Sequence, residues 1–152
     1  MNQRGVTMIE SLVALVILSV GMLGIAGLYV SGVKAGRSAL LRTQAVNLAS
    51  DMADRIRANR RAVDAYDMDT YAGAPEDQGC INAGCTPEEL AEDDLFRWQA
   101  AVIATLPGRP TPVVDVEVEE LAAEDADRYT VTVTWHEAGE DQPSTYTLVV
   151  EV

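Results

Sequence analysis

One carboxylate stands at the start of a long apolar run near the amino terminus. Glu10 precedes residues 11–33, which carry no charge. An unpaired acid inside a bilayer costs about 2.5–3.5 kcal/mol, so this carboxylate needs a partner. Cleavage after Gly5 would supply one, because the new α-amino group of Val6 would lie one helical turn from Glu10. Opposite charges about 4 Å apart attract by about 4 kcal/mol at an effective dielectric constant near 20.

The two cysteines, Cys80 and Cys85, enclose four residues that include a glycine. A loop this short can close through a disulfide, and such a pair is typical of an oxidising compartment such as the periplasm. A structural zinc site usually has four ligands, and the sequence offers neither a second Cys pair nor a nearby His. We therefore predict a Cys80–Cys85 disulfide and no metal site.

Catalytic chemistry finds little support in the sequence. His136 is the only histidine, and it lies in an alternating stretch on the predicted polar side of a strand. The acidic clusters at residues 92–94 and 117–120 are typical of solvated surfaces, and no phosphate-binding glycine loop is present. We predict no catalytic residue, no cofactor and no enzymatic activity.

The uncharged run must form the element that carries Glu10. As a helix, the 23 residues from Ser11 to Val33 reach about 34 Å, enough to cross a hydrocarbon core of about 30 Å. A cleaved secretory signal has a shorter apolar region, of about 7–15 residues. The run therefore predicts a membrane-spanning helix at residues 6–33.

The helix is expected to continue as an amphipathic half, residues 34–63. No proline precedes Pro75, so nothing interrupts the helix before about Val63. Beyond Val33 the apolar residues are spaced by three or four positions, at Leu41, Ala45, Leu48, Met52 and Ile56. This spacing places them on one face, which requires a folded partner.

Residues 64–152 predict a small α+β head. After a loop at residues 66–85, Thr86 and Pro87 begin a helix with a capping box, and Pro107-Gly108 ends it. The apolar stripe predicted for this helix consists of Leu95, Trp98, Val102 and Leu106. Three alternating stretches then predict strands, at Val114–Val118, Tyr129–Trp135 and Tyr146–Val152. Their short connections favour an antiparallel sheet of three or four strands, covered by the amphipathic half of the long helix.

Charge divides the chain near the same boundary. Residues 1–61 carry 8 basic and 3 acidic side chains, whereas residues 62–152 carry 3 basic and 21 acidic side chains. So acidic a surface repels nucleic acid and anionic lipid. We therefore expect no nucleic-acid partner.

The stretch from Arg4 to Leu18 resembles the class III leader of type IV prepilins and type II secretion pseudopilins. The shared features are a basic residue, a glycine, a glutamate at a fixed offset and a long apolar run, in that order. The resemblance implies that prepilin peptidase removes residues 1–5 by cleaving after Gly5. It also implies that Val6, where the family usually has Phe, becomes the methylated terminus and that Glu10 guides docking into a filament.

Residues 44–60 are similar to the helix extension of PilV-type minor pilins, also called type IV pilus modification proteins. The resemblance implies a protein anchored in the lipid of the inner membrane with its head in the periplasm, which then joins a tip or base complex of the pilus. Its partners would be other minor pilins and the major pilin, in pilus initiation, adhesion and twitching motility. This topology overrides the positive-inside count, in which Lys34, Arg37 and Arg42 would keep the head in the cytoplasm.

Two alternatives stay open. A minor pseudopilin of a type II secretion system would have the same architecture in a different machine. A signal-anchored periplasmic binding domain would need neither cleavage nor a filament, and an intact Met1 in the membrane protein would favour it.

Overall fold

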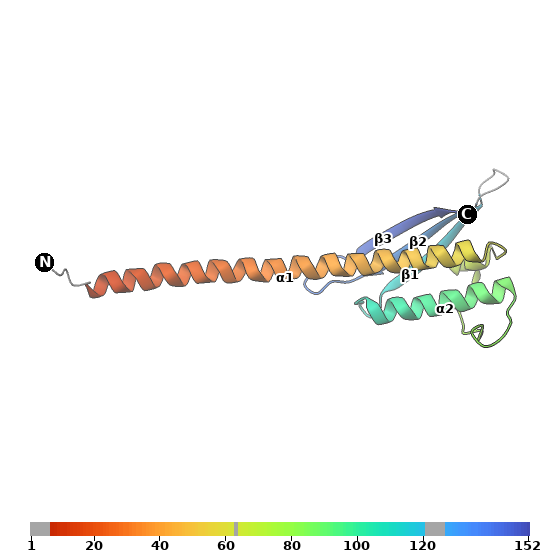
Figure 1. The fold of residues 1–152 in the computed structure, drawn as a ribbon, viewed down its shortest axis with the longest axis horizontal. Helices are drawn as coiled ribbons and strands as arrows, with labels where there is room; N and C mark the ends of the chain where they lie inside the picture. Colours follow the sequence, from red (N-terminus) through yellow and green to blue (C-terminus); the bar gives the residue numbers. More distant parts are fainter. Residues whose placement is uncertain (1–6, 63, 121–126) are drawn as a thin grey trace. The chain divides into compact units, whose positions relative to one another are not determined.

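The computed structural model describes residues 7–62, 64–120 and 127–152 (Figure 1). Its elements are a long helix α1, two short 3-10 helices η1 and η2, a shorter helix α2, and three strands. In chain order these are α1 (Met8–Ala58), η1 (Asp64–Tyr66), η2 (Met68–Thr70), α2 (Pro87–Thr105), β1 (Val113–Glu120), β2 (Asp127–Trp135) and β3 (Ser144–Glu151). The predicted α+β class is confirmed.

The chain divides into two compact units, Met1–Ala39 and Leu40–Val152. The described part of the first unit is the apolar portion of α1, in which every side chain from residue 7 to residue 37 is exposed. Among the described residues, α1 is the one helix long and apolar enough to cross a membrane. The predicted spanning segment is therefore helical from Met8 onward.

The sheet of the second unit is antiparallel, with strand order β1-β2-β3. Val116 of β1 lies opposite Val131 of β2, which in turn lies opposite Leu148 of β3. Because side chains alternate between the two faces of a strand, the apolar residues predicted for β2 share one face. All four of these are buried, namely Tyr129, Val131, Val133 and Trp135.

The core of the second unit lies between this face of the sheet, α2 and the second half of α1 (Figure 1). The predicted stripe of α2 is confirmed, since Leu95, Trp98 and Val102 are fully buried. Four members of the predicted α1 stripe are buried as expected, and Leu48 is partly buried. Ala49 and Ala53, which the spacing did not single out, are also buried on α1.

The second helix begins where the sequence predicts. The Thr86 hydroxyl accepts a hydrogen bond from the Glu89 N–H at 3.2 Å, and the Glu89 carboxylate accepts one from the Thr86 N–H at 2.8 Å. This reciprocal pair satisfies donors that a helix start leaves open. After the helix, a Cβ on Gly108 would lie 1.9 Å from the carbonyl carbon of Thr111, so only glycine fits at this position.

The first helix ends at Ala58, before the limit of Val63 that the absence of proline allowed. Residues 59–61 form a turn instead. The side-chain amide of Asn59 donates to the Pro87 carbonyl oxygen at 2.8 Å, which ties this turn to the start of α2. The predicted loop at residues 66–85 starts at the last residue of η1 and contains η2. Its first residue, Tyr66, is fully buried in the core.

Candidate functional site

The apolar part of α1 forms a large exposed hydrophobic surface. We call residues 8–33 the stem. Its large apolar side chains are between 54% and 88% exposed: Met8, Ile9, Leu12, Val13, Leu15, Val16, Ile17, Leu18, Val20, Met22, Leu23, Ile25, Leu28, Tyr29, Val30 and Val33. Contiguous apolar surface of this extent marks contact with a membrane or with other proteins.

Glu10 lies in the first turn of α1, where it is exposed and is the only acidic residue of the stem. Its backbone N–H donates to the Thr7 carbonyl oxygen at 3.1 Å. A carboxylate is favoured at a helix amino terminus by the helix dipole. Gly5 and Val6 lie outside the described residues, so pairing between Glu10 and a terminal amine on Val6 stays a prediction.

The glycines of the stem face open space, and its Ser19 forms a hydrogen bond within the same helix. A Cβ added at any of its four glycines would meet no atom within 4 Å; these are Gly21, Gly24, Gly27 and Gly32. The Ser19 hydroxyl donates to the Leu15 carbonyl oxygen at 2.7 Å, one turn earlier in the same helix. The glycines are therefore free to let another helix approach closely, as small residues do in membranes.

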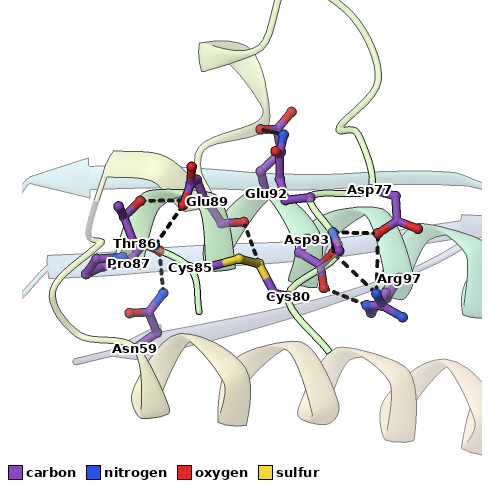
Figure 2. The surroundings of a disulfide bond; sticks show 12 residues. Asn59, Asp77, Cys80, Cys85, Thr86, Pro87, Glu89, Glu92, Asp93 and Arg97 are labelled. Carbon is purple, nitrogen blue, oxygen red and sulfur yellow. Dashed lines mark hydrogen bonds and ion pairs between the residues drawn. A yellow bond between two sulfur atoms is a disulfide. The ribbon is translucent and has the colours of Figure 1, made fainter. Parts of the chain in front are cut away.

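The disulfide predicted between Cys80 and Cys85 is present, with an S–S distance of 2.02 Å and a Cα–Cα distance of 5.6 Å (Figure 2). It lies beside the first turn of α2, with the Cys80 sulfur 3.7 Å from the Glu89 carbonyl oxygen. Cys85 directly precedes the capping residue Thr86. The disulfide therefore anchors the loop next to the helix start.

A buried carboxylate attaches the same loop further along α2. Asp93 is only 2% exposed, and it accepts hydrogen bonds from Arg97 Nε at 2.6 Å and from the Gly79 N–H at 3.1 Å (Figure 2). Gly79 has a φ of +71°, which glycine adopts readily. The hydrogen bond from Arg97 lowers the pKa of Asp93 against the opposing effect of burial. Arg97 also pairs with Asp77 of the loop at 3.4 Å.

A second polar cluster joins α1, η1 and α2. Asp94 accepts a hydrogen bond from Arg55 at 2.8 Å and one from the Tyr66 hydroxyl at 2.9 Å. Arg55 also pairs with Asp51 at 2.9 Å, the i,i+4 partner expected on a helix. Burial raises the pKa of the Tyr66 hydroxyl well above its usual value. The cluster therefore holds a neutral phenol and a charged pair together inside the head.

One further hydrogen bond fixes α2 against α1. The Trp98 indole N–H donates to the Leu48 carbonyl oxygen at 2.8 Å. Together with the contact between Arg55 and Asp94, it shows that the two helices run antiparallel within the second unit. These groups stabilise the fold of the head.

Catalytic geometry does not emerge from these clusters. Within the described parts of the chain, no group of three or more His, Cys, Asp or Glu side chains could hold a metal ion. His136 was expected on the polar side of a strand, but β2 ends at Trp135, so His136 lies just outside the sheet. Its backbone N–H donates to the Pro107 carbonyl oxygen at 3.0 Å. The surface that stands out is therefore the stem, with Glu10 at its start.

Comparison with protein families agrees with this site. A family model described as a prokaryotic N-terminal methylation motif matches residues 1–26, and one described as type IV pilin Tt1218 matches residues 27–96. The chain is a type IV pilin. As a member of this family the pilin is a structural protein and not an enzyme, as predicted. No curated protein and no solved structure matches it.

The two matches divide the functional features of the pilin between them. The methylation motif covers Gly5, Val6 and Glu10, and it implies processing by prepilin peptidase. The pilin model covers the remainder of α1, the disulfide loop and the first half of α2, including Asp93. Sequence reasoning missed Asp93 and Tyr66. The i,i+4 spacing of Asp93 and Arg97 was the available signal for the first.

Proposed function

We propose that this type IV pilin is a minor pilin of the PilV type, which takes part in initiating assembly, priming or tip formation of type IV pili. One observation carries the proposal. Every buried apolar side chain of the described residues comes from Leu41 or a later position, so the head has a core of its own while the stem remains uncovered. Lipid covers the stem before assembly, and neighbouring subunits cover it afterwards.

Removal of the leader prepares the stem for contact with neighbouring subunits. Prepilin peptidase cleaves after Gly5, and the new terminus at Val6 is methylated. Glu10 then docks against the amino group of a neighbouring subunit. The place of Glu10 in the first turn of α1 supports this role, because an otherwise uncharged stem offers one electrostatic contact at its start.

Before assembly, the pilin crosses the inner membrane once and holds its head in the periplasm. The Cys80–Cys85 disulfide supports this topology, because disulfides persist in oxidising compartments. It then joins a tip or base complex of the pilus, in contact with other minor pilins and the major pilin. The resemblance of residues 44–60 to PilV-type proteins favours the pilus over a type II secretion system, which would use the same architecture.

The assignment is tested by removing the charge of Glu10. Glu10→Ala and Glu10→Gln should leave membrane insertion and cleavage unchanged, measured by carbonate extraction and by mass spectrometry of the terminus. Incorporation into sheared pili should fall at least about tenfold, which corresponds to about 1.4 kcal/mol of lost attraction. Ser11→Ala, at the next position of the helix, is the matched control and should be incorporated normally.

Two results would contradict the proposal. Normal incorporation of Glu10→Ala would remove the docking role, and a mature protein that retains residues 1–5 would favour the signal-anchored domain. Co-purification with secretion pseudopilins in place of pilins would reassign the protein to a type II secretion system.

A further inference from the structure

A hollow of about 390 Å³ opens beside the start of α2. We call it the Tyr71 hollow; its lining residues are Asp64, Ala65, Thr70, Tyr71, Glu88, Glu89 and Glu92. A second hollow of about 710 Å³ shares Tyr71 and Glu92 with it. Nothing in the pilin assignment accounts for either hollow.

The walls of the Tyr71 hollow suit a long basic side chain. The Tyr71 hydroxyl donates to the Ala65 carbonyl oxygen at 2.6 Å, so the phenol is already satisfied and the ring remains as wall. Burial, with a smaller contribution from Glu92, raises the pKa of Tyr71 to about 12, so the ring stays neutral. The aliphatic part of Lys or Arg can pack on such a wall while its cationic end lies near the ring face.

The rim is acidic throughout. Among the described residues that line it, the four charged ones are all carboxylates, and none is Lys or Arg. Glu89 caps α2 and Glu92 accepts hydrogen bonds from the loop, so these two have structural roles. Asp64 and Glu88 are exposed and form no ion pair with any residue that the structure describes, which leaves them available to a cation.

The same chain carries a matching surface on α1. We call residues 30–42 the basic stretch. Its cations Lys34, Arg37 and Arg42 are exposed, and none forms an ion pair within the described ranges. Exposed apolar side chains accompany them, including Val33 at 57% and Leu40 at 58%. The stretch therefore offers positive charge to the carboxylates of the hollow and apolar side chains to its Tyr71 wall.

A chain cannot fill its own hollow with Arg42. Arg42 lies 16 residues before Ala58 in α1, which is about 24 Å along a helix axis. The hollow lies near the opposite end of this segment, because Asn59 contacts Pro87 at the start of α2. A cation from this stretch must therefore come from another molecule.

We propose that the Tyr71 hollow of one copy binds the basic stretch of a second copy, with the cationic end of Lys34 or Arg37 inserted between Tyr71 and the carboxylates of Asp64 and Glu88. The two surfaces differ, so the contact is heterologous and can continue from copy to copy. The contact requires the second copy to be displaced along the helix axis, because the basic stretch and the hollow lie at opposite ends of the second half of α1. Copies in a filament can be displaced in this way, whereas copies anchored side by side in one bilayer cannot. The contact does not depend on the minor-pilin role or on Glu10.

The first experiment maps the contact. A photo-cross-linking amino acid replaces Thr70, an exposed residue of the hollow. The full-length pilin is studied in mixed micelles of lipid and detergent, in which two copies can shift along their helix axes, and the products are analysed by mass spectrometry. An adduct between Thr70 of one tagged copy and residues 30–42 of a differently tagged copy is expected. Adducts only to lipid, only within one chain, or to another region of the second copy would overturn the proposal.

The second experiment reverses the charges on each side and measures the same adduct. Asp64→Lys with Glu88→Lys should reduce its yield at least about tenfold, and Lys34→Glu with Arg37→Glu should do the same. A chain carrying all four substitutions should recover the adduct, because the attraction is restored with opposite signs. Asp115→Lys with Glu117→Lys, on exposed positions of β1, is the control of equal charge change and should retain it.

Failure of the fourfold variant to recover the adduct would overturn the pairing, since it would show that the two charge groups act separately. Equal losses in the β1 control would assign the effect to net charge alone. Neither result would affect the incorporation test of Glu10, so the two proposals can fail independently.

Discussion

The two halves of α1 share one helix and use it differently. From residue 8 to residue 37 every side chain is exposed, whereas Leu40–Ala58 contributes six buried residues to the head. The first half is therefore stabilised as a helix by whatever apolar surroundings receive it, and the second half by packing within its own chain. One continuous helix thus provides an exposed apolar surface in its first half and part of the core of the head in its second half.

The comparison extends to polar groups. The second half of α1 provides Arg55, and the turn that follows it provides Asn59; both bind groups on α2 or η1. In the stem, by contrast, the Ser19 hydroxyl donates within the same helix, to the Leu15 carbonyl oxygen. Substitutions in the second half should therefore change the stability of the head, and those in the stem should leave it intact.

The largest contrast is expected between two apolar truncations. Trp98→Ala removes a fully buried ring and its hydrogen bond to Leu48, and it should cost about 3–5 kcal/mol. Leu23→Ala, at a residue that is 74% exposed, should change the free energy of unfolding of the head by less than about 0.5 kcal/mol. Urea unfolding of the full-length pilin in detergent, followed by circular dichroism, measures both. Similar losses would remove the distinction between the halves.

A pair of glycine substitutions gives the next contrast. Gly108→Ala places a methyl group 1.9 Å from the Thr111 carbonyl carbon, so the backbone must shift at a cost of about 1–3 kcal/mol. Gly21→Ala meets open space and should leave the head unchanged while favouring the helix by up to about 1 kcal/mol. Thermal unfolding separates the two. A tolerated Gly108→Ala would show that this turn adapts.

Removal of the disulfide tests the head alone. A variant with Cys80→Ser and Cys85→Ser opens a short loop, and loop-closure entropy gives a loss of about 2 kcal/mol. Reduction of the wild-type protein should produce the same loss, which serves as the control. Membrane insertion of the stem should not change. Unaltered stability after reduction would mean that Asp93 and the capping box hold the loop without help.

The smallest expected effect is the loss of head stability at low pH. Because the folded-state pKa of Asp93 is lowered, the Asp93–Arg97 pair stabilises the head above the unfolded pKa of about 3.9 and is lost as pH falls below it. The contribution should be about 1 kcal/mol, since Arg97 remains 31% exposed and solvent weakens the pair. Asp93→Asn should lower stability at pH 7 and flatten its decline between pH 5 and pH 3. Parallel pH profiles would contradict the assignment.

Much of the fold could be predicted because its periodic segments are long. The spacing of apolar residues in α1 and α2 and the alternation in the strands each identified the buried face, as at Trp98 and Val131. The capping box at Thr86 and the disulfide depend on residues close in sequence, so both were also predictable.

The polar clusters could not be predicted in the same way. Tyr66 and Asp94 are 28 residues apart in the chain, and Arg55 and Asp94 are 39 apart. Tyr66 lies in a segment without periodicity, so no local pattern indicated its burial. At the amino terminus, Glu10 was identified by its isolation in an uncharged run, and its partner remains a prediction because Val6 lies outside the described residues.

The hydroxyl of Ser19, which closes on its own helix at 2.7 Å, has a consequence for how the stem changes surroundings. A hydroxyl that donates within its own helix loses no hydrogen bond when lipid around the stem is replaced by another helix. For this residue, transfer from lipid to a helix interface is therefore transfer between two apolar environments. Under the docking role proposed for Glu10, the only charged residue of the stem, the electrostatic choice of direction and register is made at the start of the helix.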